Sequence, residues 1–526
     1  MKTKFQFVLT ILILVCNIRL NAQQVNTEWV INNIPGYPVG VMIGLDNSGN
    51  VIVTGHAGDH SNIITTKYSP QGNLIWQKNF SIPETGVNAT WQSIDQSGNV
   101  IVTGYPRTYS SNPVETGLLT IKYDNNGTLL WSNLIPGTRA FAIRSVTDAS
   151  GNIYVTGRAW QYTATHDFVT VKYSPDGTQL WFDTFDQNSG FHTPNNLALD
   201  QNGNIFVTGG GLSGGLLTVK YNNSGTRLWT REKTGAAGHS IKTDAGGNAY
   251  ITGSLWNSST NDDVMLLKYD STGNLIMEKY FDFGNVEYGR LINFDSNGNI
   301  LITGSGTIAG QFKGWLTLKL NSSGNLIWHK RFKLNNNWEE EPYYAIVGPD
   351  NEVYITGNVG VTSLGTTYNG LETIRYNSDG SNPWIANVDL YSGIGKGLVL
   401  APDKSLYAVG MYYYSVVKYG QSNITGTGGN ISETPERTDL HQNYPNPFNP
   451  VTSIKYSISQ EAKVTLEVYD ELGRKTATLV SAVQKPGVYS VSFNGSNYVS
   501  GIYYYRLKAG NGAYSFTETK RMILLK

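Results

Sequence analysis

The chain has little cysteine, little charge and few long apolar runs. Its one cysteine, Cys16, lies in an apolar segment near the start, so a mature protein without that segment has neither disulfide nor thiol chemistry. Charged residues make up 15% of the 526 positions, and 39 basic residues balance 39 acidic ones. No global field therefore draws the chain to nucleic acid or to an anionic membrane, and we expect no nucleic-acid partner.

The one long apolar run is predicted to be a targeting segment. Two lysines flank the start, the run covers residues 5–15, and Ala22 offers a small residue before a cleavage site. This run is shorter than the roughly 20 residues that a membrane-spanning helix needs. We expect a signal peptide at residues 1–22 and no transmembrane segment in the mature chain. Lipidation of Cys16 is the lesser alternative.

One frame returns eight times along the chain. The pattern is an Asp, a Gly-Asn turn that the first six copies contain, a short apolar strand that ends in Gly, and a strand that ends in Lys-Tyr or a close variant. The closing glycines lie 44 to 53 residues apart, which is room for four short strands and is typical of propeller blades. The copies begin at Asp46, Asp95, Asp148, Asp200, Asp244, Asp295, Asp350 and Asp403.

Two turns of each copy are nearly constant in length, and two connections vary. The Asp-to-Gly distance is nine residues in six copies and seven in the last two. In the first seven copies the Tyr that ends the third strand, or once Leu, lies eight positions before the Trp of the fourth strand, or once Met. Because the strands of a meander alternate in direction, both constant turns lie at one end of a blade, the constant end. Function is expected at the opposite, variable end.

The strand count predicts how the ring closes. The last copy ends at Lys418-Tyr419 without a Trp strand, whereas residues 27–30 form an unpaired Trp strand near the start. Unpaired strand edges are a liability, so we predict that the Trp29 strand completes the last blade. The fold class is therefore all-β, with an eight-bladed β-propeller over residues 23–419. The repeated Asp and Lys are interpreted as scaffold, since a residue present in every blade is rarely a site.

The repeat units resemble a bacterial β-propeller repeat family of secreted proteins. The hallmark is the stretch Asp148-Ala-Ser-Gly-Asn-Ile-Tyr-Val-Thr-Gly157, and the resemblance covers about residues 29–419. It implies the fold and carries no activity.

A different segment follows the repeats. Residues 420–437 have no apolar periodicity and are predicted to be a flexible linker. Residues 438–526 contain about seven short alternating strands, which predicts a small Ig-like β-sandwich. This segment resembles the type A carboxy-terminal sorting domain of the type IX secretion system, in Tyr444-Pro-Asn-Pro-Phe-Asn-Pro450 and Ser500-Gly-Ile-Tyr-Tyr-Tyr-Arg506 among other motifs.

That resemblance implies a cellular location and a partner. The protein is expected to pass through the periplasm of a Gram-negative bacterium and to engage the type IX machinery through residues 438–526. The domain is then expected to be removed, leaving a protein that is either released or held on the outer cell surface. We expect the mature protein to be a monomer.

Catalytic and metal motifs are weak. Gly211-Leu-Ser213-Gly-Gly215 fits a nucleophile-elbow pattern but joins two strands rather than a strand and a helix, so it is interpreted as coincidence. His56, Asp59 and His60 cluster in sequence and are weak metal candidates; otherwise we expect neither metal nor cofactor.

Aromatic residues of the variable connections are the stronger candidates. Flat rings with a polar edge suit sugar rings or partner side chains. The competing interpretation is that they pack between blades. The ligand-binding candidates are Trp160, Trp256, Tyr162, Tyr109, Trp338 and Tyr368.

Two functions are compatible with these features. The favoured one is a secreted or cell-surface, non-catalytic module that binds glycan or protein. The alternative is an extracellular polysaccharide hydrolase or lyase with a carboxylate pair on the variable-loop face, which requires two acids a few ångström apart beside aromatics in a pocket. Acids at that face are Asp59, Glu84, Glu115, Asp167, Asp186, Asp262, Asp263, Glu287, Glu339, Glu340 and Glu341.

Overall fold

The computed structural model describes most of the chain after the first 26 residues, as two compact units that we treat separately. Within these described residues no helix is long and apolar enough to cross a membrane. The described ranges are 27–31, 39–109, 114–137, 140–160, 166–185, 192–211, 215–257, 261–283, 286–307, 312–333, 339–363, 366–381, 384–388, 393–411, 415–419, 438–440, 442–443, 446–485, 487–511 and 515–525.

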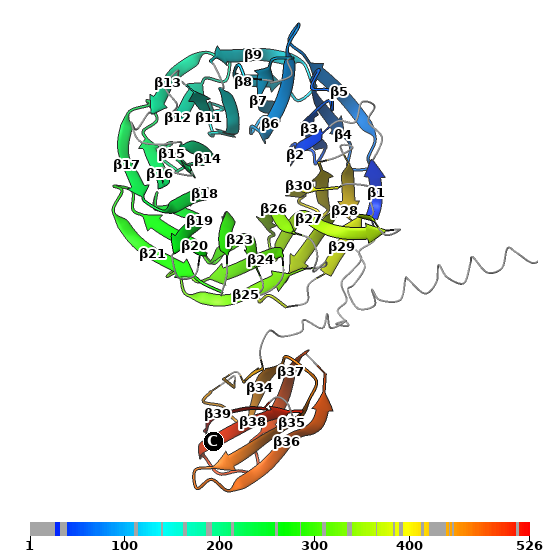
Figure 1. The fold of residues 1–526 in the computed structure, drawn as a ribbon, viewed down its shortest axis with the longest axis vertical. Coiled ribbons are helices and arrows are strands. Elements are labelled where there is room, and N and C mark those ends of the chain that lie inside the picture. Colours follow the sequence, from blue (N-terminus) through cyan, green and yellow to red (C-terminus); the bar gives the residue numbers. More distant parts are fainter. Residues whose placement is uncertain are drawn as a thin grey trace, which may run out of the picture. The chain divides into compact units, whose positions relative to one another are not determined.

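The first unit is a ring of antiparallel four-stranded sheets, each a blade whose first strand lies innermost (Figure 1). The all-β propeller fold predicted from the repeats is thereby confirmed. The first four sheets are β2 (Val39–Leu45), β3 (Val51–His56), β4 (Ile63–Tyr68) and β5 (Leu74–Phe80); β6 (Gly86–Ile94), β7 (Val100–Arg107), β8 (Gly117–Tyr123) and β9 (Leu129–Pro136); β10 (Phe141–Thr147), β11 (Ile153–Trp160), β12 (His166–Tyr173) and β13 (Gln179–Phe185); and β14 (Thr193–Leu199), β15 (Ile205–Gly211), β16 (Gly215–Tyr221) and β17 (Arg227–Lys233).

Four further sheets follow in the same direction around the ring. They are β18 (Ala236–Thr243), β19 (Ala249–Asn257), β20 (Asn261–Tyr269) and β21 (Leu275–Phe281); β22 (Glu287–Phe294), β23 (Ile300–Thr307), β24 (Lys313–Leu320) and β25 (Leu326–Phe332); β26 (Glu341–Val347), β27 (Val353–Ser363), β28 (Thr366–Tyr376) and β29 (Trp384–Val388); and β30 (Gly395–Leu400), β31 (Leu406–Gly410), β32 (Val416–Tyr419) and β1 (Thr27–Ile31).

The repeated Asp is a turn residue. Asp46 Oδ1 accepts hydrogen bonds from the N–H groups of Ser48 and Asn50, both at 2.9 Å, and Oδ2 accepts from the Asn50 side chain. Gly49 takes a φ of 76°, which glycine adopts without steric cost. These bonds close the first constant turn and confirm the scaffold role predicted for the Asp.

The sequence frame is shifted by two residues in the last two blades. There the turn begins at Gly348 and Ala401, whose N–H groups each donate to a carbonyl four residues later at 2.8 Å, as Asp46 N–H does at 3.0 Å. Asp350 and Asp403 lie two residues further on. Counted from Gly348 and Ala401, the closing glycine again follows after nine residues. The alignment of these two copies on Asp350 and Asp403 is therefore wrong, because neither Asp occupies the first position of the turn.

Every innermost strand carries a β-bulge at the same place. One residue, five positions before the start of the turn, has no partner on the second strand of its blade, and the register shifts by one across it. A bulge of this kind bends the strand and redirects the side chain. The bulge residues are Val41, Thr90, Ile143, Asn195, His239, Arg290, Tyr343 and Lys396.

Neighbouring blades are joined at the constant end by what we call the blade latch. The indole N–H of Trp76 donates to Asn125 O of the next blade at 3.2 Å, and Lys67 Nζ donates to the same oxygen at 2.9 Å. Lys67 also pairs with Asp46 of its own blade at 2.6 Å. The indole bond recurs as Trp29 to Pro70, Trp131 to Pro175, Trp181 to Asn223, Trp229 to Ser271 and Trp328 to Ser378.

Strand β1 closes the ring in the way predicted from the unpaired Trp strand. It pairs antiparallel with β32 and forms the outer edge of the last blade. Lys418 pairs with Glu28 of β1 at 2.7 Å, and Trp29 donates from its indole to Pro70 O of the first blade at 3.2 Å. The two ends of the propeller chain are thus held by both a sheet and a blade latch.

The second unit is a β-sandwich with one hydrophobic core. Its three-stranded sheet has the order β33-β34-β37 and its four-stranded sheet β36-β35-β38-β39. Phe448 is buried in the core, and its backbone bonds to Ile523 and Leu525 fix the final strand. The strands are β33 (Asp439–Leu440), β34 (Val451–Ile458), β35 (Ala462–Asp470), β36 (Lys475–Gln484), β37 (Gly487–Asn494), β38 (Gly501–Gly510) and β39 (Ser515–Leu524).

Deletion of residues 27–31 tests the closure. The deletion exposes the edge of β32 and removes the latch between the last and first blades, so we expect aggregation or loss of a single cooperative unfolding transition. Urea unfolding followed by tryptophan fluorescence measures this. Trp256→Ala, which truncates an exposed side chain, is the control and should leave the midpoint unchanged. A truncated protein as stable as the intact one would contradict the closure.

Candidate functional site

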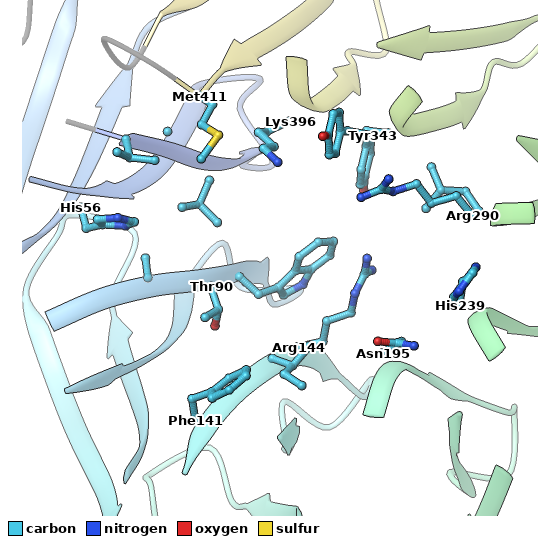
Figure 2. A pocket seen from close by; sticks show the side chains of 18 of the residues that line it. His56, Thr90, Phe141, Arg144, Asn195, His239, Arg290, Tyr343, Lys396 and Met411 are labelled. Carbon is cyan, nitrogen blue, oxygen red and sulfur yellow. The ribbon is translucent and has the colours of Figure 1, made fainter. Parts of the chain in front are cut away.

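A cavity of about 610 Å³ lies among the innermost strands (Figure 2). Its lining residues belong mostly to the first half of each innermost strand, which follows a variable connection and precedes a constant turn. His56 and Met411, at or just after the ends of second strands, also line it. The cavity therefore lies toward the variable end, where function was expected, but inner strands rather than loops build its wall.

All eight bulge residues line this cavity, one from each blade. The bulges thus direct one side chain per blade toward the same space. The residue type changes around the ring: Val41, Thr90 and Ile143 are small or apolar, whereas the five that follow are polar, aromatic or charged. A cavity with two unlike sides can orient a ligand as well as hold it.

Arg144 stacks on an aromatic ring at the wall. Its Cζ lies 4.0 Å from the centroid of Trp91, and the Trp91 ring lies 6.4 Å from that of Tyr344. Burial, with a smaller contribution from the charge of Arg290, lowers the pKa of Arg144 to about 10. Arg144 remains a cation near pH 7. It has no ion-pair or hydrogen-bond partner among the described residues.

A second cluster surrounds Tyr343. Lys396 Nζ lies 3.8 Å and Arg290 Cζ 4.4 Å from the centroid of this ring. Arg290 Nη1 also pairs with Glu341 Oε2 at 3.0 Å, and the Tyr288 hydroxyl donates to the other oxygen of Glu341. Burial and the nearby charge of Arg290 lower the pKa of Lys396 to about 8, against an opposing effect of Glu341. No carboxylate of the described chain pairs with Lys396.

His239 completes the polar side of the ring. Its Nδ1–H donates to Gly289 O at 2.8 Å, and its ring meets Tyr288 edge-on at 5.8 Å. Burial lowers the pKa of His239, so the imidazole is neutral near pH 7. With Nδ1 engaged, the ring is fixed in orientation at the cavity wall.

The aromatic candidates predicted from the loops do not line the cavity where the structure describes them. The side chains of Tyr109 and Trp256 are 58% and 62% exposed, and neither contributes to the wall. The backbone of Trp160 ends β11, but its side chain lies outside the described residues. Three further candidates, the side chains of Tyr162, Trp338 and Tyr368, also lie outside them.

The weak metal candidates are brought only partly together. The rings of His56 and His60 stack at 5.4 Å, and His60 Nδ1 bonds to Asn88 Oδ1 at 2.6 Å. Asp59 accepts instead from the N–H of Ser61, at 3.0 Å. Across the described chain, these three residues do not form a group whose ligand atoms converge.

A group of three acids converges elsewhere. One carboxylate oxygen from each of Asp263, Asp282 and Glu287 lies within 4.8 Å of the others. Glu287 is fully buried and pairs with Arg331 at 3.2 Å, and Asp263 is also buried. None of the three lines the cavity, and no carboxylate appears among the cavity's lining residues in the described chain.

Sequence reasoning missed the ring of bulge residues because it sought ligand contacts in the variable connections, not in the innermost strands. A signal was present: five residues before the turn, the aligned copies carry eight different residue types. The two-residue frame error would still have misplaced Tyr343 and Lys396, whose turns start at Gly348 and Ala401.

The buried His56 predicts that the protein becomes less stable as the pH falls. Burial, with the nearby charges of His60 and Arg107, lowers the pKa of His56 to about 4. The unfolded chain, with a pKa of about 6.5, takes up its proton first as the pH falls. Stability is therefore lost between about pH 6.5 and pH 4, by about 3 kcal/mol if His56 acts alone. We expect His56→Gln to flatten the fall of the urea midpoint over this range. An unchanged pH profile would contradict the shift.

Comparisons with known proteins agree with the two-part architecture. Residues 442–524 match the family described as "Secretion system C-terminal sorting domain". The search of curated proteins finds no match. Together with the sheets described above, the family match confirms the predicted resemblance, a β-propeller followed by a sorting domain. The sorting domain implies secretion to the surface or exterior of a bacterium.

Solved structures similar to the chain have low identity to it. The "Dos1 propeller" has a TM-score of 0.48 at 10% identity, covering 75% of this chain and 95% of its own. A virginiamycin B lyase from Staphylococcus aureus has 0.40 at 11%, with 75% and 99% covered. PorZ, an essential surface component of the type-IX secretion system of Porphyromonas gingivalis, has 0.28 at 12%, with 93% and 81% covered. The propeller assignment therefore rests on the sheets of this chain itself.

Proposed function

We propose that this protein is a non-catalytic binding protein, exported by the type IX secretion system, that takes a glycan into the cavity at the variable end of its propeller. In this proposal residues 1–22 are a signal peptide, 23–419 the propeller, 420–437 a linker and 438–526 a sorting domain removed on export from a Gram-negative cell. The mature protein acts outside the cell or on its outer surface.

The convergence of the eight bulge residues is the observation that carries this proposal. Scaffold residues repeat from blade to blade, whereas these eight differ and meet at one cavity. Its volume of about 610 Å³ falls in the range of roughly 300 to 1,000 Å³ found for ligand sites. Trp91, Tyr343 and Tyr344 supply ring faces, and Asn195 and His239 supply polar groups, which is the combination that suits a sugar.

The alternative, a polysaccharide hydrolase or lyase, finds less support. It requires two carboxylates beside the substrate. The acids that do converge lie outside the cavity wall, and two of the three are buried. Glu341 is bonded to Arg290 and Tyr288, which do line the cavity. Binding without turnover is therefore the function that the site supports best.

Trp91→Ala tests whether the ligand binds in the cavity or at the exposed aromatic residues of the loops. The change removes a ring face from the wall and the support of Arg144, so we expect retention on an immobilised polysaccharide panel to fall at least tenfold. Trp256→Ala is the matched control, since it removes an exposed indole outside the cavity. Affinity electrophoresis measures retention, and reducing-end and unsaturated-product assays measure turnover.

Three results decide the test. Loss of retention in Trp91→Ala alone, without products, supports the proposal. Loss of retention in Trp256→Ala alone would mean that the ligand binds at the loops and not in the cavity. Product formation that is abolished by substituting a single Asp or Glu would establish the enzyme instead.

A further inference from the structure

We propose that the ligand of this cavity is an acidic glycan, with a carboxylate or sulfate group bound among Arg144, Arg290 and Lys396. This inference rests on the proposed binding function and specifies its ligand. Figure 2 shows the three labelled side chains at the cavity. They belong to separate strands, β10, β22 and β30.

Positive charge at the cavity exceeds negative charge. Arg290 is paired with Glu341, which leaves Arg144 and Lys396 without a carboxylate partner among the described residues. The cations that line the cavity are thus Arg144, Arg290 and Lys396. Three blades thus contribute like charges to one partly enclosed space, an arrangement that is costly without a compensating anion.

The stacked geometry leaves hydrogen-bond donors available. The ring of Trp91 covers a face of the Arg144 guanidinium, and Tyr343 lies against Lys396 and Arg290. A ring face attracts the cation but accepts no in-plane N–H bond. Arg144 has no hydrogen bond to any described residue, although a guanidinium carries five N–H donors. The side chain is therefore held in place while no residue that the structure describes accepts a hydrogen bond from it.

These donors define the chemistry of the ligand. The planar fork of a guanidinium matches the paired oxygens of a carboxylate or sulfate, and the ammonium of Lys396 adds a point charge. Phe141 and Ile143, beside Arg144 on β10, offer an apolar wall to ring carbons. An acidic sugar combines both features, whereas a neutral sugar would leave the two cations unpaired.

The experiment uses the mature exported protein with three probes. Polygalacturonate carries carboxylates, a sulfated galactan carries sulfates, and dextran is neutral. We expect isothermal titration to show binding of at least one acidic probe, no binding of dextran, and weakening as salt rises. Arg144→Met with Lys396→Met should weaken acid binding at least tenfold. Arg144→Lys, which retains the charge but loses the fork, should weaken it less.

A matched control removes the same charge elsewhere. Lys78→Met with Lys279→Met changes two side chains of the outer strands β5 and β21, and it should leave acid binding within about twofold. The melting temperature of each variant confirms folding. If the double cavity variant unfolds, the single variants Arg144→Lys and Lys396→Gln are compared with the control in its place.

The outcomes separate this inference from the proposed function. Binding of dextran but neither acidic probe overturns the anionic ligand and leaves glycan binding intact. Binding of no probe overturns both. Acid binding that falls equally in the control and cavity variants identifies general surface charge and overturns the assignment to the cavity. Polygalacturonate and the sulfated galactan, compared directly, identify which acidic group is preferred.

Discussion

The blade latch is the contact on which the rest of the propeller depends. In the second blade, Lys122 pairs with Asp95 at 3.1 Å and donates to Pro175 O of the next blade at 3.2 Å, where the indole of Trp131 also donates at 3.1 Å. The lysine is almost fully buried, so its charge must be compensated on every side. Each such group fixes both its own turn and the turn of its neighbour.

Because of this requirement, residues at the constant end of the propeller can vary less from blade to blade than residues at the variable end. At the constant end a change in the Asp or the Lys leaves a buried charge unpaired, and a change in the Trp removes the indole donor from a carbonyl of the next blade; both are destabilising. The variable end has no such repeated network among the described residues, so its side chains are free to differ from blade to blade. The cavity lies at that end, and its eight bulge residues follow a register set by the constant turns. The repeated turns of the constant end thus fix the positions of the eight different bulge residues that line the cavity.

Much of the fold was predictable because its determinants are local. The Asp turn, the hairpin glycine and the Trp strand recur at fixed spacing, and the unpaired strand at Trp29 required a partner. The frame of the last two blades was not predictable in this way. Gly348 and Ala401 replace the turn Asp, and positive φ falls on Asn351 and Lys404 instead of glycine, so the local signal is missing. The site was less predictable still, for a geometric reason. A bulge leaves little trace in the apolar pattern, and closure of the ring, not sequence proximity, brings residues as distant as Arg144 and Lys396 to one cavity.

A crystal structure of the mature protein soaked with an acidic oligosaccharide tests the assignment of the cavity most directly. We predict ligand density inside the cavity, with an acidic group within hydrogen-bond distance of Arg144 and a sugar ring against the wall formed with Trp91 and Tyr343. Density against the exposed loop rings of Tyr109 or Trp256, with the cavity holding only water, would contradict it.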